Sequence, residues 1–224
     1  MRREKTSVSQ EDYLKAIWEM LEDEATPISA RLAEQLGVTP PAVTAALKRM
    51  TRDDYLRVGR DGAIRLTAKG RTVAQHLALR HQLAEKLLTD IVGLEWAKAH
   101  EEAERLEHAI SPEVEALLVA RFGENATCPH GVPFVGGITK LRKKHGAVPL
   151  SEVPEGESVE VLAVYERDPK FLQFLDRVAL KPGVEARVRK REYDQTTLLN
   201  INGKNVHLGV PATSRIWVRR LKTS

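Results

Sequence analysis

Apolar residues in the first half of the chain recur every three or four positions, which predicts amphipathic helices. The first of these helices follows Ser9. The second begins near Ile28 and ends before Gly37, a natural helix stop, and the third runs from Pro41 to Asp54. Two helices joined by a tight glycine turn are the pattern of a helix-turn-helix.

Residues 55–67 continue with two short alternating segments around Asp61 and Gly62. An Asp-Gly pair between such segments predicts a β-hairpin. A hairpin directly after a helix-turn-helix is a wing. We therefore predict that residues 1–75 form a winged helix-turn-helix DNA-binding domain.

The third predicted helix exposes small and hydroxyl side chains near its start and cations further along. Short side chains allow close approach to the major groove, and cations there and on the hairpin suit phosphate contacts. Because few hydrogen-bonding side chains lie at the helix start, we expect DNA shape to carry much of the sequence preference. The candidate DNA-binding residues are Arg31, Thr39, Pro41, Ala42, Thr44, Ala45, Lys48, Arg49, Arg57 and Arg60.

A long helix from Thr67 to about Val92 is predicted to be apolar on more than one face. This pattern fits a helix that packs in its own domain and against a second subunit. Further apolar patterns around Leu106 and from Pro112 to Phe122 predict two more helices. Residues 76–140 are therefore expected to form a helical metal-binding and dimerisation domain of a homodimer.

Residues 126–137 are rich in proline and glycine and are predicted to connect this domain to the next. After residue 148 the pattern changes to short alternating strands with glycine turns and one helix, from Pro169 to Val178. This pattern predicts a small SH3-like β-barrel over residues 148–224. The expected fold class is mainly α with small β elements.

Histidine and glutamate residues on the predicted helices have a spacing that suits a metal site. If residues 94–114 form one helix, Glu104, Glu107 and His108 share one face, and His100 lies one turn earlier. His81 and Glu85 repeat this spacing on the preceding helix. A solvated charged face is the common alternative. Crowded carboxylates, however, repel one another unless a cation lies between them.

Charge is uneven along the chain, although the net charge is +4. Residues 27–75 carry nine Lys or Arg against four Asp or Glu, and residues 76–140 carry six against ten. The first segment is therefore the candidate for phosphate contacts and the second for a cation. Residues 141–224 are basic again, which we interpret as protection of strand edges rather than a second DNA surface.

The composition, with 42% hydrophobic residues in 224, is typical of a globular protein. The chain has no run of eighteen apolar residues and its start lacks an apolar core, so we expect a cytoplasmic protein. Cys128 is the single cysteine, which excludes an internal disulfide. It lies beside His130, where a metal site is conceivable, but the nearby sequence offers no further soft ligand.

Several strings together give the chain a resemblance to the diphtheria-toxin-repressor family of metal-dependent transcriptional regulators, in its three-domain form. They are EDYLKAI, RLAEQLGVTPPAVTAALKRM, LTAKGR, RHQLAEKLLTDIVGL, EEAERLEHAIS and CPHGVPF. The resemblance covers essentially the whole chain. It implies DNA-binding, dimerisation and SH3-like (FeoA-like) domains in the order predicted above.

The resemblance also implies two metal sites. The positions matching the primary site are Asp12, Glu104, Glu107 and His108. Those matching the ancillary site are His81, Glu85 and His100, with Glu166 and Asp168 as candidates from the SH3-like domain.

Asp12 and Glu104 stand where iron-type members of the family have a methionine and a cysteine. Oxygen ligands with one imidazole suit Mn(II), so the resemblance favours the manganese-responsive members. The chain departs from the two-domain manganese-responsive members at Lys15, where they have an acidic ligand, and Ala45 replaces the family's base-contacting glutamine.

We therefore expect a homodimeric repressor that binds a palindromic operator when Mn(II) is bound and controls manganese uptake genes. An Fe(II)-responsive regulator of the same family is the nearest alternative. A winged-helix regulator that senses an organic ligand is a second. A metal-dependent hydrolase is the least favoured, because the sequence shows no nucleophile motif or phosphate-binding loop, and we predict that the protein is not an enzyme.

Overall fold

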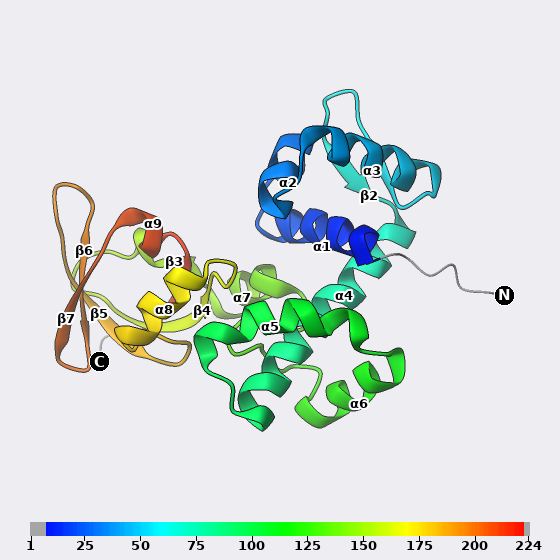
Figure 1. The fold of residues 1–224 in the computed structure, drawn as a ribbon. Coiled ribbons are helices and arrows are strands. Elements are labelled where there is room, and N and C mark those ends of the chain that lie inside the picture. The colour runs from blue at the N-terminus through cyan, green and yellow to red at the C-terminus, as the bar shows by residue number, and fades with distance from the viewer. Residues whose placement is uncertain (1–7, 222–224) are drawn as a thin grey trace. The chain divides into compact units, whose positions relative to one another are not determined.

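A computed structural model describes residues 8–221, and the chain divides into two compact units, Met1–Arg80 and His81–Ser224. Figure 1 shows the order of the elements. No helix within the described range is long and apolar enough to span a membrane. The expectation that the chain lacks an export signal rests partly on residues 1–7, which lie outside that range.

The first unit is a helical domain with a two-stranded hairpin. Its elements are α1 (Val8–Glu22), α2 (Ser29–Leu36), α3 (Pro40–Arg52), β1 (Leu56–Val58), β2 (Ile64–Leu66) and the first part of α4 (Ala68–Leu87). The hairpin is antiparallel, with Leu56 opposite Leu66 and Val58 opposite Ile64. The predicted helices and hairpin are therefore present, in the predicted order.

The helix-turn-helix is held by apolar side chains that point inward from each element. Gly37 adopts the left-handed conformation (φ 62°) that ends α2 and redirects the chain. Leu14 and Ile17 of α1, Leu32 of α2 and Met50 of α3 are fully buried in one core. Burial of such a side chain contributes about 1.5–3 kcal/mol to folding, so this core fixes α3 on the unit.

The second unit begins within α4 and continues through short helical elements. They are the π-helix η1 (Leu88–Val92), the 3-10 turns η2 (Trp96–Lys98) and η3 (Glu107–Ala109), and the α-helices α5 (Ala99–Leu106), α6 (Pro112–Phe122) and α7 (Gly137–His145).

Residues 94–114 do not form the single helix on which the shared face of Glu104, Glu107 and His108 depended, because α5 ends at Leu106. Pro112 is the first residue of α6, and a proline disfavours helical conformation in the residue before it. Ser111 is accordingly extended (φ −72°, ψ 160°), and its side chain accepts a hydrogen bond from the Val114 N–H. Glu107 consequently lies on the 3-10 turn η3, one element beyond Glu104.

The second unit ends in a six-stranded antiparallel sheet with the strand order β3-β8-β4-β5-β6-β7. The elements are β3 (Val148–Pro149), η4 (Leu150–Glu152), β4 (Ser158–Val164), α8 (Pro169–Arg177), β5 (Glu185–Arg191), β6 (Thr197–Ile201), β7 (Lys204–Leu208), α9 (Val210–Thr213) and β8 (Ile216–Arg220).

The C-terminal sheet and α8 share one apolar core. Leu172 and Leu175 of α8 are fully buried with Val161, Val188 and Val218 of the sheet. The prediction of short strands around a helix that starts at Pro169 is confirmed, and the structure adds the strand β3 and the short helix α9. Strand pairing in the described residues leaves β3 and β7 as two edges, so the SH3-like closure stays a prediction.

Candidate metal centre

Two helices of the second unit bring three candidate ligands into direct contact. His81 and Glu85 lie one turn apart on α4, and His100 lies on α5. His81 Nε2 is 3.1 Å from Glu85 Oε1 and 2.9 Å from His100 Nδ1, and His100 Nδ1 is 3.2 Å from Glu85 Oε1. All three side chains are buried. The spacing that suggested a shared site thus corresponds to a compact cluster.

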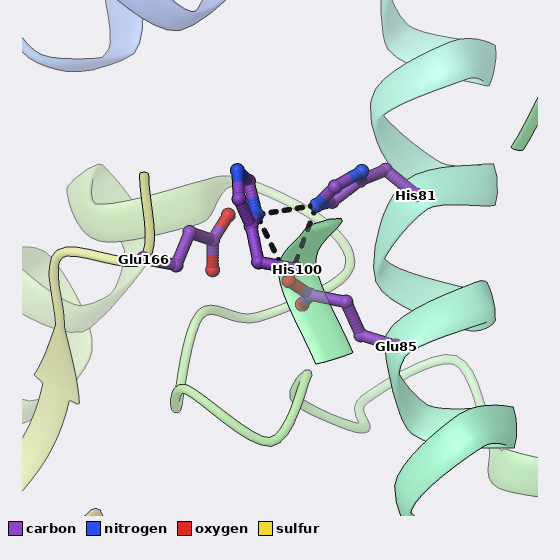
Figure 2. A group of neighbouring side chains, drawn as sticks. All are labelled: His81, Glu85, His100 and Glu166. Atoms are coloured by element: carbon purple, nitrogen blue, oxygen red, sulfur yellow. Dashed lines mark hydrogen bonds and ion pairs between the residues drawn. The ribbon is translucent and has the colours of Figure 1, made fainter. Parts of the chain in front are cut away.

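Glu166 reaches this cluster from the C-terminal part of the unit. It lies two residues beyond the end of β4 and points toward the histidines from the side opposite α4 (Figure 2). One ligand atom each from His81, Glu85, His100 and Glu166 lie within 4.8 Å of one another. The structure therefore brings together four of the five residues predicted for the ancillary site.

Asp168, the fifth predicted residue, lies elsewhere. Its carboxylate accepts a hydrogen bond from the Phe171 N–H at 3.1 Å and so caps the start of α8. Its other oxygen is 3.1 Å from Arg215 Nη1. An aspartate directly before Pro169 is a helix cap by position, which explains why it does not join the cluster.

A second set of ligands shares Glu85 and Glu166 and adds Cys128 and His130. One atom from each of these four residues also lie within 4.8 Å of one another. His130 Nδ1 is 3.2 Å from Glu85 Oε1 and 3.6 Å from Glu166 Oε2. The Cys128 thiol donates to Glu166 Oε2 at 3.4 Å. The two sets are therefore parts of one buried centre.

The loop that carries Cys128 and His130 is fixed by backbone contacts. Thr127 and Pro133 form an isolated antiparallel bridge at its base. Gly131 has a left-handed φ of 90°, and a Cβ there would lie 1.9 Å from the Leu162 carbonyl oxygen. Only glycine allows this approach to β4. Val164 N–H donates to the His130 carbonyl oxygen at 2.9 Å, so β4 holds the histidine against the centre.

The sequence identified Cys128 and His130 as neighbours but not their partners. Glu85 lies more than forty residues before them and Glu166 more than thirty residues after them. The contacts depend on how the loop packs between α4 and β4, and no local spacing reports this. The Pro- and Gly-rich string around the pair was the sequence feature that drew attention to these two residues.

Neighbouring charges in the centre shift the pKa values of Glu85, His130 and Cys128. Burial alone would raise the pKa of Glu85, but the positive charges of His130 and His81 hold it well below its usual value. Burial alone would lower the pKa of His130, but Glu85 and Glu166 raise it to about 10. Burial and the two carboxylates raise the pKa of the Cys128 thiol well above its usual value. Without a metal, protonated His130 therefore partly balances the carboxylates.

Two buried atoms of the centre have no hydrogen-bond partner among residues 8–221: Glu85 Oε2 and His130 Nδ1. An unsatisfied buried polar group costs about 1–3 kcal/mol. A cation held by carboxylate and imidazole would satisfy both atoms, and such nitrogen and oxygen donors suit first-row divalent metals. The chemistry of the residues therefore fits a metal ion.

The predicted primary ligands of the second unit adjoin this centre. Glu107 is buried, and its Oε2 is 2.6 Å from His81 Nδ1, while its Oε1 is 3.8 Å from His108 Nε2. Glu104 is more exposed and lies 3.7 Å from His100 Nε2. Asp12 belongs to α1 of the first unit. The set of four stays a prediction.

The predicted DNA-binding residues lie on exposed parts of the first unit. On α3 the buried side chains are Val43, Ala46, Leu47 and Met50, and the predicted DNA-binding side chains of this helix are exposed. Arg57 and Arg60 lie on the hairpin and are also exposed. The helix-turn-helix exposes the remaining candidates, which are Arg31, Thr39, Pro41, Ala42, Thr44, Ala45, Lys48 and Arg49.

Three protein-family models match consecutive parts of the chain. The model for the N-terminal DNA-binding domain of iron-dependent repressors matches residues 5–64, and the model for their metal-binding and dimerisation domain matches residues 67–135. The FeoA domain model matches residues 148–220. The chain belongs to the diphtheria toxin repressor family. This family consists of metal-dependent transcriptional repressors, and the resemblance noted in the sequence is confirmed.

Comparisons with individual members of the diphtheria toxin repressor family support this assignment. The diphtheria toxin repressor of Corynebacterium jeikeium is 44% identical over 67% of this chain and 59% of its own length. The iron-dependent repressor IdeR of Mycobacterium tuberculosis is 40% identical over 68% of this chain and 69% of its own length. A manganese-dependent transcriptional repressor in complex with manganese is 29% identical, with a TM-score of 0.82 over 95% of this chain and all of that one.

Proposed function

We propose that the chain is a Mn(II)-activated repressor that binds operator DNA as a homodimer and controls manganese uptake genes. The observation that carries the proposal is the buried centre, where Glu85 Oε2 and His130 Nδ1 have no hydrogen-bond partner among residues 8–221, in a chain that also has a DNA-binding domain. In support of manganese, most donors of the centre are carboxylate oxygen or imidazole nitrogen.

Fe(II) is the second candidate. Two of the three family models are named for iron-dependent repressors, and IdeR of Mycobacterium tuberculosis is named an iron-dependent repressor. The Cys128 thiol is also a softer donor than any carboxylate, which favours Fe(II) over Mn(II) at the ligand set that includes it.

We propose a role for each group of residues. His81, Glu85, His100 and Glu166, together with Cys128 and His130, hold metal in the buried centre. Asp12, Glu104, Glu107 and His108 form the primary site that the family resemblance implies. A bound divalent ion supplies positive charge that offsets the repulsion among the crowded carboxylates.

We also propose three functional segments, residues 1–75, 76–140 and 148–224, with an SH3-like topology for the last. The family models match similar stretches of the chain, which supports this division. The exposed face of α3 enters the major groove, and Ala45 there leaves hydrogen-bonded base readout sparse. Exposed apolar residues Ile91, Val92 and Leu117 support pairing with a second copy, and two-fold pairing favours a palindromic operator.

An anaerobic titration tests the choice of metal. A DNA duplex selected by this protein from a random library in the presence of Mn(II) would be titrated with protein in Mn(II), Fe(II) or a chelator. We expect the duplex to be retarded at Mn(II) concentrations at least tenfold below the Fe(II) concentrations that give the same retardation. With the chelator, binding should be lost. Retardation at lower Fe(II) would favour the iron alternative. Binding that is indifferent to the chelator would reject both.

The charges in the centre predict proton release on metal binding. In the metal-free protein, Cys128 and His130 are both protonated at neutral pH, because their pKa values are raised, that of His130 to about 10. Metal ligation needs thiolate and a neutral imidazole nitrogen. Binding at this set should therefore release about two protons per ion, and affinity should rise with pH throughout the range below the His130 pKa.

Isothermal titration calorimetry with Mn(II) in buffers of different ionisation enthalpy measures the proton count. His130→Ala should lower the count by about one, and Cys128→Ala should do the same. A count near zero in the unsubstituted protein would show that Cys128 and His130 do not bind the ion.

A further inference from the structure

We propose that Trp96 is a positioning residue of the metal centre, and that it fixes the His130 ring so that Nδ1 faces the ion. The inference rests on the proposed function, because it assumes that His130 binds metal. Trp96 begins the 3-10 turn η2, just before α5, and touches the centre through the loop that carries His130.

Trp96 and the loop exchange two hydrogen bonds. The indole Nε1–H of Trp96 donates to the Pro129 carbonyl oxygen at 2.8 Å. In return, His130 Nε2 lies 3.3 Å from the Trp96 carbonyl oxygen. The two rings also contact each other, with centroids 4.9 Å apart and planes inclined by 50°. One residue therefore holds both the backbone and the ring of the ligand segment.

The bond to the carbonyl decides which nitrogen of His130 can bind a cation. A carbonyl oxygen can only accept, so Nε2 must carry hydrogen, and Nδ1 is the nitrogen available as a ligand. Nδ1 is the buried atom that lies 3.2 Å from Glu85 Oε1. Partners of this kind behind a ligating histidine set its tautomer and orientation.

The far side of the Trp96 ring is held by the C-terminal part of the same unit. The ring packs against the apolar core of the sheet and α8. The ammonium of Lys181 lies 5.1 Å from the ring centroid. Trp96 is also four residues before the ligand His100. The indole thus connects the position of His130 to both α5 and the C-terminal sheet.

The test uses the full chain and calorimetric titration with Mn(II). Trp96→Phe keeps an aromatic ring beside His130 and Lys181 but removes the bond to Pro129. We expect it to weaken Mn(II) binding about tenfold, the lower end of the range for loss of an outer partner of a ligand. Trp18→Phe, at a residue that packs against the core of the first unit, is the matched control and should leave the affinity unchanged.

A double-mutant cycle separates positioning from general packing. If Trp96 acts through His130, Trp96→Phe should have no further effect on affinity in a His130→Ala background. A tenfold loss in both backgrounds would overturn the proposal, and so would unchanged affinity for Trp96→Phe alone. If His130→Ala itself leaves Mn(II) affinity unchanged, the assignment of His130 as a ligand fails and the positioning role fails with it.

A measurement on the unsubstituted protein tests the proposal without depending on whether a variant folds. With ¹¹³Cd(II) in place of Mn(II) and ¹⁵N-labelled histidine, metal–nitrogen coupling in the NMR spectrum identifies the ligating atom. We expect coupling to Nδ1 of His130 and a proton on Nε2. Coupling to Nε2 would overturn the proposal even if His130 binds the metal.

Discussion

Glu85→Gln is expected to lower the affinity of the full chain for Mn(II) by more than about 100-fold. Glu85 is fully buried and belongs to both ligand sets of the centre. Its Oε1 lies 3.1 to 3.2 Å from nitrogens of His81, His100 and His130. An amide of the same shape removes the negative charge that every one of these contacts uses, so no alternative arrangement within the centre replaces it.

Calorimetric titration with Mn(II) measures this effect, and thermal unfolding without metal measures any loss of stability. Glu101→Gln is the matched control, because Glu101 is exposed on α5 next to His100 and belongs to neither ligand set. A Glu85→Gln protein that binds Mn(II) within tenfold of the unsubstituted chain would show that the buried centre is not the metal site.

His108→Ala is expected to abolish the Mn(II)-dependent part of DNA binding while leaving a folded dimer. His108 follows Glu107 on the turn η3 and is one of the predicted primary ligands. It does not belong to either ligand set of the buried centre. The variant should therefore still bind Mn(II) in the centre, yet its affinity for the selected duplex in Mn(II) should fall to the level seen with a chelator.

Gel retardation with and without Mn(II), together with sedimentation of the free protein, distinguishes these effects. His207→Ala is the control, since His207 lies exposed on β7. If His108→Ala keeps its full Mn(II) response, the primary site implied by the family resemblance is not used in this chain. Loss of the dimer would instead assign His108 a structural role.

The parts of the fold that were predicted correctly depend on local rules. Gly37 ends one helix because of its backbone freedom, and the Asp61–Gly62 turn closes the hairpin. The strands between β4 and β8 were predicted because apolar and polar side chains alternate along them. The assumption that one helix spans residues 94–114 was wrong, whereas the helix start predicted at Pro112 is present.

The centre was only partly predictable for a different physical reason. His81 and Glu85 share a helix face, so their spacing of four residues reports their proximity directly. Glu166 and Asp168 are both acidic and nearly adjacent, and nothing in their spacing tells which one reaches the histidines. Capping of α8 engages Asp168, and the direction of the chain beyond β4 leaves Glu166 at the centre.

By itself, the sequence determined the helix-turn-helix, the hairpin, the strands and the helical pair His81 and Glu85, because each depends on neighbours within a few residues. Only the tertiary structure decided that Cys128, His130 and Glu166 meet Glu85. Contacts between residues so far apart in the chain depend on the close approach of Gly131 to β4 and on the hydrogen bond from Trp96 to the loop. Packing of whole elements creates such contacts, and no local pattern encodes them.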